Sequence, residues 1–214
     1  MVRWMDRSIT IKVMRLIQSL QEDPHYVAIF RYRNKRTFWE KSALKNRPSD
    51  WPRLVEMAWI ECESDGTIIA EFESVIQPDS FTISRQASAI HGITTQIALE
   101  DGLPLITVLK KFHAALDNCA LIIGHNVDFD LNVVAAESLR AGISSRLQFL
   151  QRKCTMKSSV SLCKLKRGTG YKYPTLAELH FFLFGEPFPK NHRALSDARA
   201  CMKCFFELKK RGIF

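Results

Sequence analysis

The sequence predicts an α/β domain in which helices flank a mixed β-sheet. Leu54 to Cys62 and Thr67 to Ile76 have the composition of strands, and the turn Ser64-Asp65-Gly66 joins them, which predicts a hairpin. Helical and strand patterns then alternate along the chain, with no internal repeat and no linker. A hairpin followed by alternating elements is typical of a mixed sheet covered by helices.

Four later segments have apolar residues at helical spacing. They are Leu105–Leu116, Phe129–Arg140, Leu176–Phe184 and Ala194–Arg211. Gly142 and Gly185 follow two of these helices and are expected to be their C-caps. A buried strand is expected at Ala120–Gly124, and the segment around Ile90–Ile93 is expected to be irregular.

The N-terminal segment predicts an amphipathic helix over residues 8–21. Its apolar side chains fall on one helical face: Ile9, Val13, Leu16, Ile17 and Leu20. Packing against the domain is favoured over membrane contact because the polar face is not densely basic. We therefore expect a helical extension at 1–24 and one α/β domain at 25–214, opening with a short β-rich run at 25–30.

The composition excludes several classes of protein. The 214 residues are 46% hydrophobic and 25% charged, which is ordinary for a globular chain. No uncharged apolar run approaches the roughly 20 residues that span a bilayer, and the first 20 residues lack the features of a secretory signal. Six cysteines lie mostly in apolar stretches, which indicates buried, reduced thiols and a cytoplasmic location, and core packing for the Cys201-x-x-Cys204 pair.

The charge distribution favours an anionic partner. Lysine plus arginine number 31 and aspartate plus glutamate 22, so the formal charge is +9. The window from Arg31 to Arg47 contains seven basic residues and one acid, Glu40, and so carries +6 of that charge. Nucleic acid is the commonest partner of such a chain, although a solvated basic loop is the plainer interpretation.

Two segments contain the residue types of a catalytic site. Gly124-His125-Asn126-Val127-Asp128-Phe129-Asp130 leads from a buried strand into a helix, and His192-Arg193-Ala194-Leu195-Ser196-Asp197 opens the last helix. Asp130 would project from a first helical turn, where the helix dipole favours an anion, at a strand end that opens to a cleft. Taken singly, each aspartate is equally compatible with an ordinary role at a helix start.

Together, and in this order, these segments resemble the DEDDh branch of the DnaQ-like 3′–5′ exonucleases, which have an RNase H-like fold and include the epsilon proofreading subunit of DNA polymerase III. The resemblance runs from Tyr26 to about Phe214 and so makes 25–214 an exonuclease-like domain. It rests on His125-Asn126-x-x-Phe129-Asp130, on His192-x-x-x-x-Asp197 and on Ile90-His91-Gly92-Ile93-Thr94. Trp51–Val55 and Gly170–Leu176 are similar to a bacterial subgroup.

The resemblance implies a metal-dependent site. In the family, four carboxylates hold two divalent metals such as Mg²⁺ or Mn²⁺, and a histidine is the general base. On this chain the resemblance makes Asp130 and Asp197 metal ligands and His192 the base. It also places His91 at the nucleotide pocket, with an ordinary loop histidine as the alternative.

The first acidic motif is where the chain departs from the family. The family has Asp-x-Glu after a first strand, whereas here Val27-Ala28-Ile29-Phe30 continues as Arg31-Tyr32-Arg33. Two guanidiniums at that position would repel a divalent ion by several kcal/mol, at an effective dielectric of about 20 and about 4 Å. We therefore expect no resident metal and no two-metal hydrolysis, although Glu56, Glu61 and Glu63 follow on the next strand.

Three hypotheses follow. The first is an inactive or impaired exonuclease homologue that binds the 3′ end of single-stranded DNA or RNA through Arg31, Arg33, Lys35, Arg36 and His91. The second is an active exonuclease that binds Mg²⁺ or Mn²⁺ through Asp130 and Asp197 and uses His192 as base. The third is a docking protein that self-associates or binds a protein through the N-terminal helix, with no membrane contact.

One further segment is strongly basic. Lys164, Lys166, Arg167 and Lys172 flank Gly168 and Gly170. We expect a mobile basic loop there that is able to contact a phosphate backbone.

Overall fold

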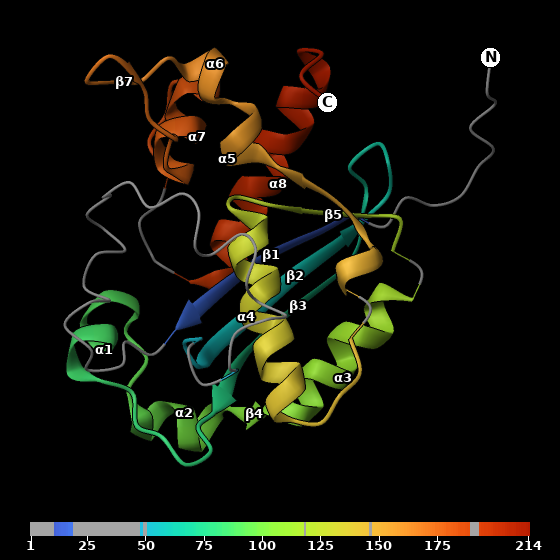
Figure 1. Ribbon diagram of the computed structural model, residues 1–214, viewed down its shortest axis with the longest axis vertical. Coiled ribbons are helices and arrows are strands. Elements are labelled where there is room, and N and C mark those ends of the chain that lie inside the picture. Colours follow the sequence, from blue (N-terminus) through green and yellow to red (C-terminus); the bar gives the residue numbers. More distant parts are fainter. Residues whose placement is uncertain (1–10, 19–47, 49–50, 118, 146, 189–192) are drawn as a thin grey trace.

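The computed structural model describes residues 11–18, 48, 51–117, 119–145, 147–188 and 193–214. One six-stranded sheet has the order β4-β3-β2-β1-β5-β6, and a separate two-stranded hairpin lies outside it (Figure 1). The strands of the sheet are β1 (Ile11–Gln18), β2 (Leu54–Cys62), β3 (Ile68–Gln77), β4 (Leu103–Pro104), β5 (Leu121–Gly124) and β6 (Gln151–Cys154).

The pairing makes the sheet mixed, as predicted. β2 is antiparallel to both β1 and β3, whereas β1, β5 and β6 run parallel to one another. Strand β1 therefore lies inside the sheet, with Ile17 opposite Glu56 of β2 and Val13 opposite Ile123 of β5. β5 ends at Gly124, one residue after the Ile123 that pairs with Val13, so β1 continues toward the same edge past the point where the helix after β5 begins.

Helices cover both faces of the sheet. On one face α3 (Leu105–Leu116) and α4 (Val127–Arg140) enclose a core that includes Trp51, Trp59 and Phe112. On the other face α7 (Leu176–Phe184) and α8 (Ala194–Lys210) pack over Ile60, Cys62 and Ile123. The alternation along β2 explains the two cores, because successive side chains of a strand point to opposite faces.

Shorter elements complete the described chain. Two seven-residue helices, α1 (Arg85–His91) and α2 (Thr95–Asp101), lie near the end of β3 (Figure 1). A 3₁₀ turn, η3 (Leu147–Phe149), precedes β6, and α5 (Thr155–Ser158) and α6 (Val160–Cys163) follow it. The outlying hairpin is β7 (Lys166–Arg167) and β8 (Gly170–Tyr171).

Most of the predicted elements are confirmed. The hairpin of β2 and β3, the buried strand at β5 and the four long helices are present within a few residues of the expected bounds. Gly185 ends α7 with φ of 74°, as a left-handed C-cap should. The C-cap of α4 is Ala141 and the expected Gly142 follows it with φ of 65°. All six cysteines are buried free thiols.

The predicted N-terminal amphipathic helix at 8–21 is wrong where the structure describes it. Ile11–Gln18 is a strand of the sheet with neighbours on both sides. A strand covered on both faces needs no polar alternation, so its apolar spacing can imitate a helix. The β-rich run at 25–30 and the expected boundary after residue 24 lie outside the described residues.

Two further expectations are corrected. The segment around Ile90–Ile93 is not irregular, because α1 continues to His91 and is capped by Gly92 with φ of 75°. The basic loop after Lys164 is a hairpin, held by β7 and β8. Among the described residues, no helix has both the length and the apolar character that crossing a membrane requires.

Candidate nucleic-acid site

The turn from β5 into α4 positions Asp130. A Cβ at Gly124 would lie 2.9 Å from the Val127 Cβ, so only glycine lets the chain turn this tightly into the helix. His125 fixes the turn from the side, because its Nδ1 lies 3.0 Å from Thr155 Oγ1 and its Nε2 lies 2.9 Å from the Pro174 carbonyl oxygen. Asp130 then lies in the first turn of α4, with 8% of its surface exposed.

Carboxylates from the sheet anchor the start of α8, which carries Asp197. Glu56 Oε1 accepts from Arg193 Nε at 2.7 Å, and its Oε2 accepts from the Ala194 amide at 2.9 Å. Glu73 Oε1 accepts from the Leu195 amide at 3.1 Å. Two amides at the helix start are thus satisfied by acidic side chains, which the helix dipole also favours.

Glu56 is a fully buried carboxylate. Desolvation raises its pKa above the usual value, and the bonds from Ala194 and Arg193 partly oppose that rise. Its role is therefore to hold the α8 start, through Arg193, in a fixed position on β2. The sequence signal for this role was a single glutamate within an otherwise apolar stretch of strand, Leu54-Val55-Glu56-Met57-Ala58.

The two predicted aspartates are both buried, on helices that cover opposite faces of the sheet. Asp197 is 3% exposed in the first turn of α8, and Cys201 lies one turn further along. Burial raises the pKa of the Cys201 thiol, and the negative charge of Asp130 adds a smaller rise. Thr155 Oγ1, which contacts His125, also lies 3.6 Å from Cys201 Sγ.

The described residues do not fit a two-metal site. Within the described ranges, no group of three or more His, Cys, Asp or Glu side chains is arranged to hold a metal ion. Glu56 is committed to Arg193, and Glu61 accepts from Trp59 Nε1 at 3.1 Å, so neither is placed to replace a lost ligand. Asp130 and Asp197 remain as two carboxylates from two helices.

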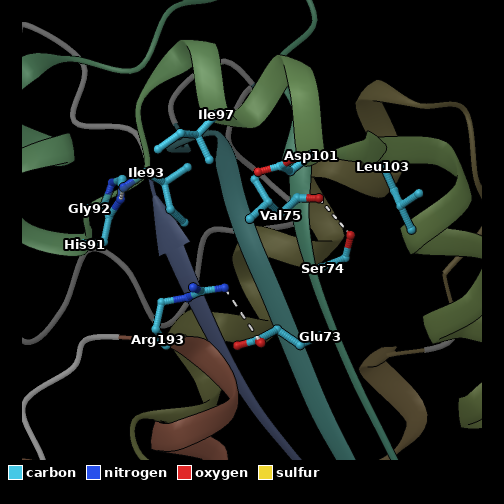
Figure 2. Close-up of a pocket in the computed structure, with 10 residues that line it drawn as sticks. All are labelled: Glu73, Ser74, Val75, His91, Gly92, Ile93, Ile97, Asp101, Leu103 and Arg193. Atoms are coloured by element: carbon cyan, nitrogen blue, oxygen red, sulfur yellow. Dashed lines mark hydrogen bonds and ion pairs between the residues drawn. The ribbon is translucent and has the colours of Figure 1, made fainter.

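A cavity of about 570 Å³ opens beside the start of α8 (Figure 2). Arg193 and Glu73 face each other across 3.7 Å on one side of it, and Gly92, Ile93 and Ile97 lie on another. His91, predicted for the nucleotide pocket, lines this cavity. Polar side chains that line the cavity therefore come from the end of α1, from strand β3 and from the start of α8.

His91 presents a buried hydrogen-bond donor. Its Nδ1 accepts from the Ile93 amide at 3.1 Å, so the ring proton of the neutral form is on Nε2. That Nε2 is buried and has no hydrogen-bond partner among the described residues. Burial lowers the pKa of His91 to about 4, so the ring is neutral at physiological pH.

Several predicted site residues lie outside the described residues. They are Arg31, Arg33, Lys35, Arg36 and His192. The structure brings Asp130 and Asp197 to the starts of two helices at one edge of the sheet, and it puts His91 at the cavity next to the α8 start.

This architecture, a mixed sheet of order β3-β2-β1-β5-β6 with β2 antiparallel to both its neighbours and helices on both faces, is that of the RNase H-like class of folds. Residues 44–205 match the RNase_T family model, described as an exonuclease. The chain therefore belongs to this exonuclease family, and the resemblance to DnaQ-like exonucleases is confirmed.

Two curated relatives are similar over most of this chain. The PolC-type DNA polymerase III of Pediococcus pentosaceus is 26% identical over 162 residues, which cover 74% of this chain and 10% of that protein. The 3′-5′ exonuclease DinG of Bacillus subtilis is 27% identical over 168 residues, which cover 78% of this chain and 16% of that protein. The chain thus spans a small part of these relatives.

Solved structures have the same fold. E. coli exonuclease I in a zinc-bound complex with single-stranded DNA superimposes with a TM-score of 0.66 at 18% identity, covering 95% of this chain and 41% of that one. The same enzyme in complex with a dT13 oligonucleotide gives 0.68 at 17% identity, with the same coverage of both chains. At this identity the likeness establishes the fold.

Proposed function

We propose that this chain binds the 3′ end of a single strand of DNA or RNA on an exonuclease fold and hydrolyses it slowly or not at all. Family membership and the formal charge of +9 support nucleic acid as the partner. A solved relative with the same fold, E. coli exonuclease I, binds single-stranded DNA.

The observation that carries the proposed loss of hydrolysis is the missing first acidic motif. The strand that lies between β2 and β5 has the sequence Ile-Lys-Val-Met-Arg-Leu-Ile-Gln and contains no carboxylate. The β-rich run at 25–30 continues instead into Arg31-Tyr32-Arg33. Neither of these two segments contains the Asp-x-Glu that the resemblance requires.

Charge balance points the same way. Two divalent cations need about four negative charges, whereas Asp130 and Asp197 supply two. In this proposal Arg31 and Arg33 either pair with those two aspartates, which balances the charge without a metal, or grip the phosphate that metals hold in the family. Lys35 and Arg36 beside them extend the contact along the phosphate backbone.

His91 has a binding role in the proposal. A neutral imidazole whose Nε2–H is buried and lacks a described partner can donate to an oxygen or nitrogen of a bound nucleotide. The adjoining Ile93 and Ile97 offer apolar contact to a base or sugar. Because the ring stays neutral near pH 7, this contact should be insensitive to pH between 6 and 8.

Active hydrolysis is the second candidate, and it is favoured by the retention of Asp130, Asp197 and His192 in family-like segments. It requires metal bound by two aspartates or a ligand from outside the described residues. The third hypothesis, docking through an N-terminal amphipathic helix, loses its basis because Ile11–Gln18 is a strand.

The test combines metal titration with a strand assay on the full chain. Calorimetric titration of Mn²⁺ and incubation with a 5′-labelled single strand, so that shortening from the 3′ end is visible, should give no metal binding and no ladder. The same strand should be retained at low salt and released at high salt. Metal-dependent shortening that disappears in Asp130→Asn and Asp197→Asn would establish the active alternative.

A restoring variant tests the reason for the loss. Arg31→Asp combined with Arg33→Glu should create Mn²⁺ binding, measured as a metal-dependent rise in Tm. Lys41→Asp with Lys45→Glu, in the same basic window, makes the same change of charge and should give no such rise. Equal behaviour of both double variants would contradict the alignment of Arg31 and Arg33 with the acidic motif.

A further inference from the structure

The hairpin of β7 and β8 stands away from the sheet at one corner of the molecule (Figure 1). Lys166 pairs with Tyr171 and Arg167 pairs with Gly170, and Gly168-Thr169 forms the turn. The Lys172 amide donates to the Leu165 carbonyl at 2.9 Å and extends the ladder by one bond. None of the six described strands of the main sheet pairs with this hairpin. The main sheet therefore does not account for the amino-acid composition of the hairpin.

The hairpin is strongly basic. Between residues 164 and 172 there are four cationic side chains and no carboxylate. Lys164, Lys166 and Arg167 are exposed, and the fourth, Lys172, is paired with Glu178 of α7. Repulsion between neighbouring cations does not stabilise a two-stranded ribbon. The concentration of positive charge therefore indicates a role in binding an anion.

Exposed aromatic side chains accompany these charges. Tyr171 is 52% exposed and lies opposite Lys166, so the two share one face of the ribbon. Phe181 and Phe182 of α7 are 58% and 43% exposed. They follow Glu178 by three and four residues, so they lie on the helix face that Lys172 contacts. Tyr171 precedes Lys172 in the ladder and therefore points to the opposite side of the ribbon, together with Lys166.

This surface adjoins the aspartate site. Pro174, two residues after Lys172, accepts at its carbonyl from the His125 ring at 2.9 Å, and His125 begins the segment that leads to Asp130. Thr175 caps α7 in a capping box with Glu178, which fixes the base of the hairpin against the helix. A chain leaving the Asp130 site past His125 would therefore meet the hairpin next.

We propose that the exposed side of the hairpin formed by Lys164, Lys166 and Tyr171, here named the hairpin face, binds the single strand of nucleic acid upstream of its 3′ end. The lysines contact phosphates and the ring of Tyr171 stacks on a base. The proposal rests on the proposed function, because it places the body of the strand whose 3′ end lies at the Asp130 site.

Charge and ring exposure favour a single strand over the other occupants. Stacking on exposed rings needs bases that are free of a duplex, and it tolerates any sequence. A protein interface of ordinary composition has few lysines at its centre. Cations interleaved with aromatic rings are the combination that single-strand grooves use.

The test measures binding of a fluorescent dT20 by anisotropy at several salt concentrations, with Ca²⁺-free buffer and EDTA so that no strand is cut. Tyr171→Ala should weaken binding by about fivefold or more, the lower end for loss of one stacked base. Lys164→Gln with Lys166→Gln should lower the slope of log K against log salt by about 1.4, or about 0.7 for each phosphate that is no longer neutralised.

Matched controls lie on the other face of the sheet. Phe149→Ala removes a ring that is 77% exposed, and Lys110→Gln with Lys111→Gln removes two exposed lysines of α3. Neither should change affinity by more than about twofold. All variants change exposed side chains, and an unchanged Tm confirms that each one folds.

The outcomes separate this proposal from the proposed function. If the wild-type chain binds dT20 and the hairpin variants behave as the controls do, the hairpin face is refuted and the proposed function stands. If the wild-type chain does not bind dT20 at 50 mM salt, both fail. Phe181→Ser with Phe182→Ser changes rings on the side of the ribbon that Lys172 contacts and should leave affinity unchanged; a loss of affinity as large as that of Tyr171→Ala would contradict the placement of the strand on the hairpin face. An oligonucleotide carrying 5-iodouracil should crosslink to Tyr171 in the wild-type chain.

Discussion

Removal of Arg193 should destabilise the fold far more than removal of Arg199, although both arginines bind carboxylates of the sheet from α8 or its start. Arg193 Nε lies 2.7 Å from a Glu56 oxygen, and the two side chains are 46% and 0% exposed. Arg199 pairs with Glu71, and there the exposed fractions are 54% and 24%. The difference lies in the acid, because only Glu56 has no access to water.

The magnitude follows from that burial. Loss of one partner from a fully buried pair costs about 3–5 kcal/mol, and loss from an exposed pair costs about 0–1 kcal/mol. Since the Arg193 side chain is itself half exposed, we expect about 2 kcal/mol for Arg193→Met and about 0.5 kcal/mol for Arg199→Met. In a chain of this size these correspond to falls in Tm of about 4–8 °C and about 1–2 °C.

Acid should reverse part of the Arg193→Met defect. Desolvation already raises the pKa of Glu56, and loss of the guanidinium removes an influence that lowers it. A carboxyl group whose pKa is higher in the folded state binds a proton more readily there, so the folded state gains stability as pH falls toward the unfolded value. The Tm deficit of Arg193→Met should therefore shrink between pH 7.5 and 5.5, while that of Arg199→Met should not. Equal deficits in the two variants, or a deficit that widens in acid, would refute this account of Glu56.

Three other predictions concern single groups. The pKa of His91 is about 4 in the folded chain and near 6.5 in the unfolded chain. The contribution of the neutral ring to stability is therefore present above pH 6.5 and is lost between pH 6.5 and 4. In His91→Gln, the pH dependence of the urea midpoint should become flatter in this range. Burial raises the pKa of Cys204 to about 12 and also raises the pKa of Cys201. A disulfide-exchange reagent should therefore label these two thiols only after unfolding. Rapid labelling of the native chain would contradict the packing of α8. Gly185→Ala should cost about 1 kcal/mol, measured by urea denaturation, because φ at this C-cap is 74° while no atom crowds a Cβ there; a neutral result would mean that the α7 end rearranges.

Elements with a strong apolar periodicity, or with clear residues for helix starts and stops, were predictable from sequence. The helix α7 is bounded by Thr175 and Gly185, and its predicted limits are those of the structure. The strand β1 was not predictable, because Val13, Leu16 and Ile17 fit a helical face as well as a strand buried on both sides. Pairing with β2 and β5 decides between the helix and the strand, and β5 is more than 100 residues away in the chain.

The site was predictable in part for a related reason. Asp130 and Asp197 follow local signals, since each lies in the first turn of a helix that begins at a recognisable segment. The network that fixes the start of α8 joins Glu56 to Arg193, which are 137 residues apart, so the local pattern marks Glu56 as unusual in its strand but does not identify Arg193 as its partner. Likewise, the cavity at His91 exists only because α1, β3 and the start of α8 meet in space.

The interior position of β1 has a consequence for how the chain acquires its structure. This strand leaves the ribosome before the rest of the sheet, yet its parallel neighbour β5 begins at Leu121, 103 residues after Gln18. At roughly 5–20 residues per second, about 5–20 s of synthesis separate the two strands. Until β5 arrives, β1 can pair only with β2, and the growing hairpin exposes an open strand edge that can recruit another chain. Nascent chains that pause before residue 121 are therefore the species in which aggregation should begin.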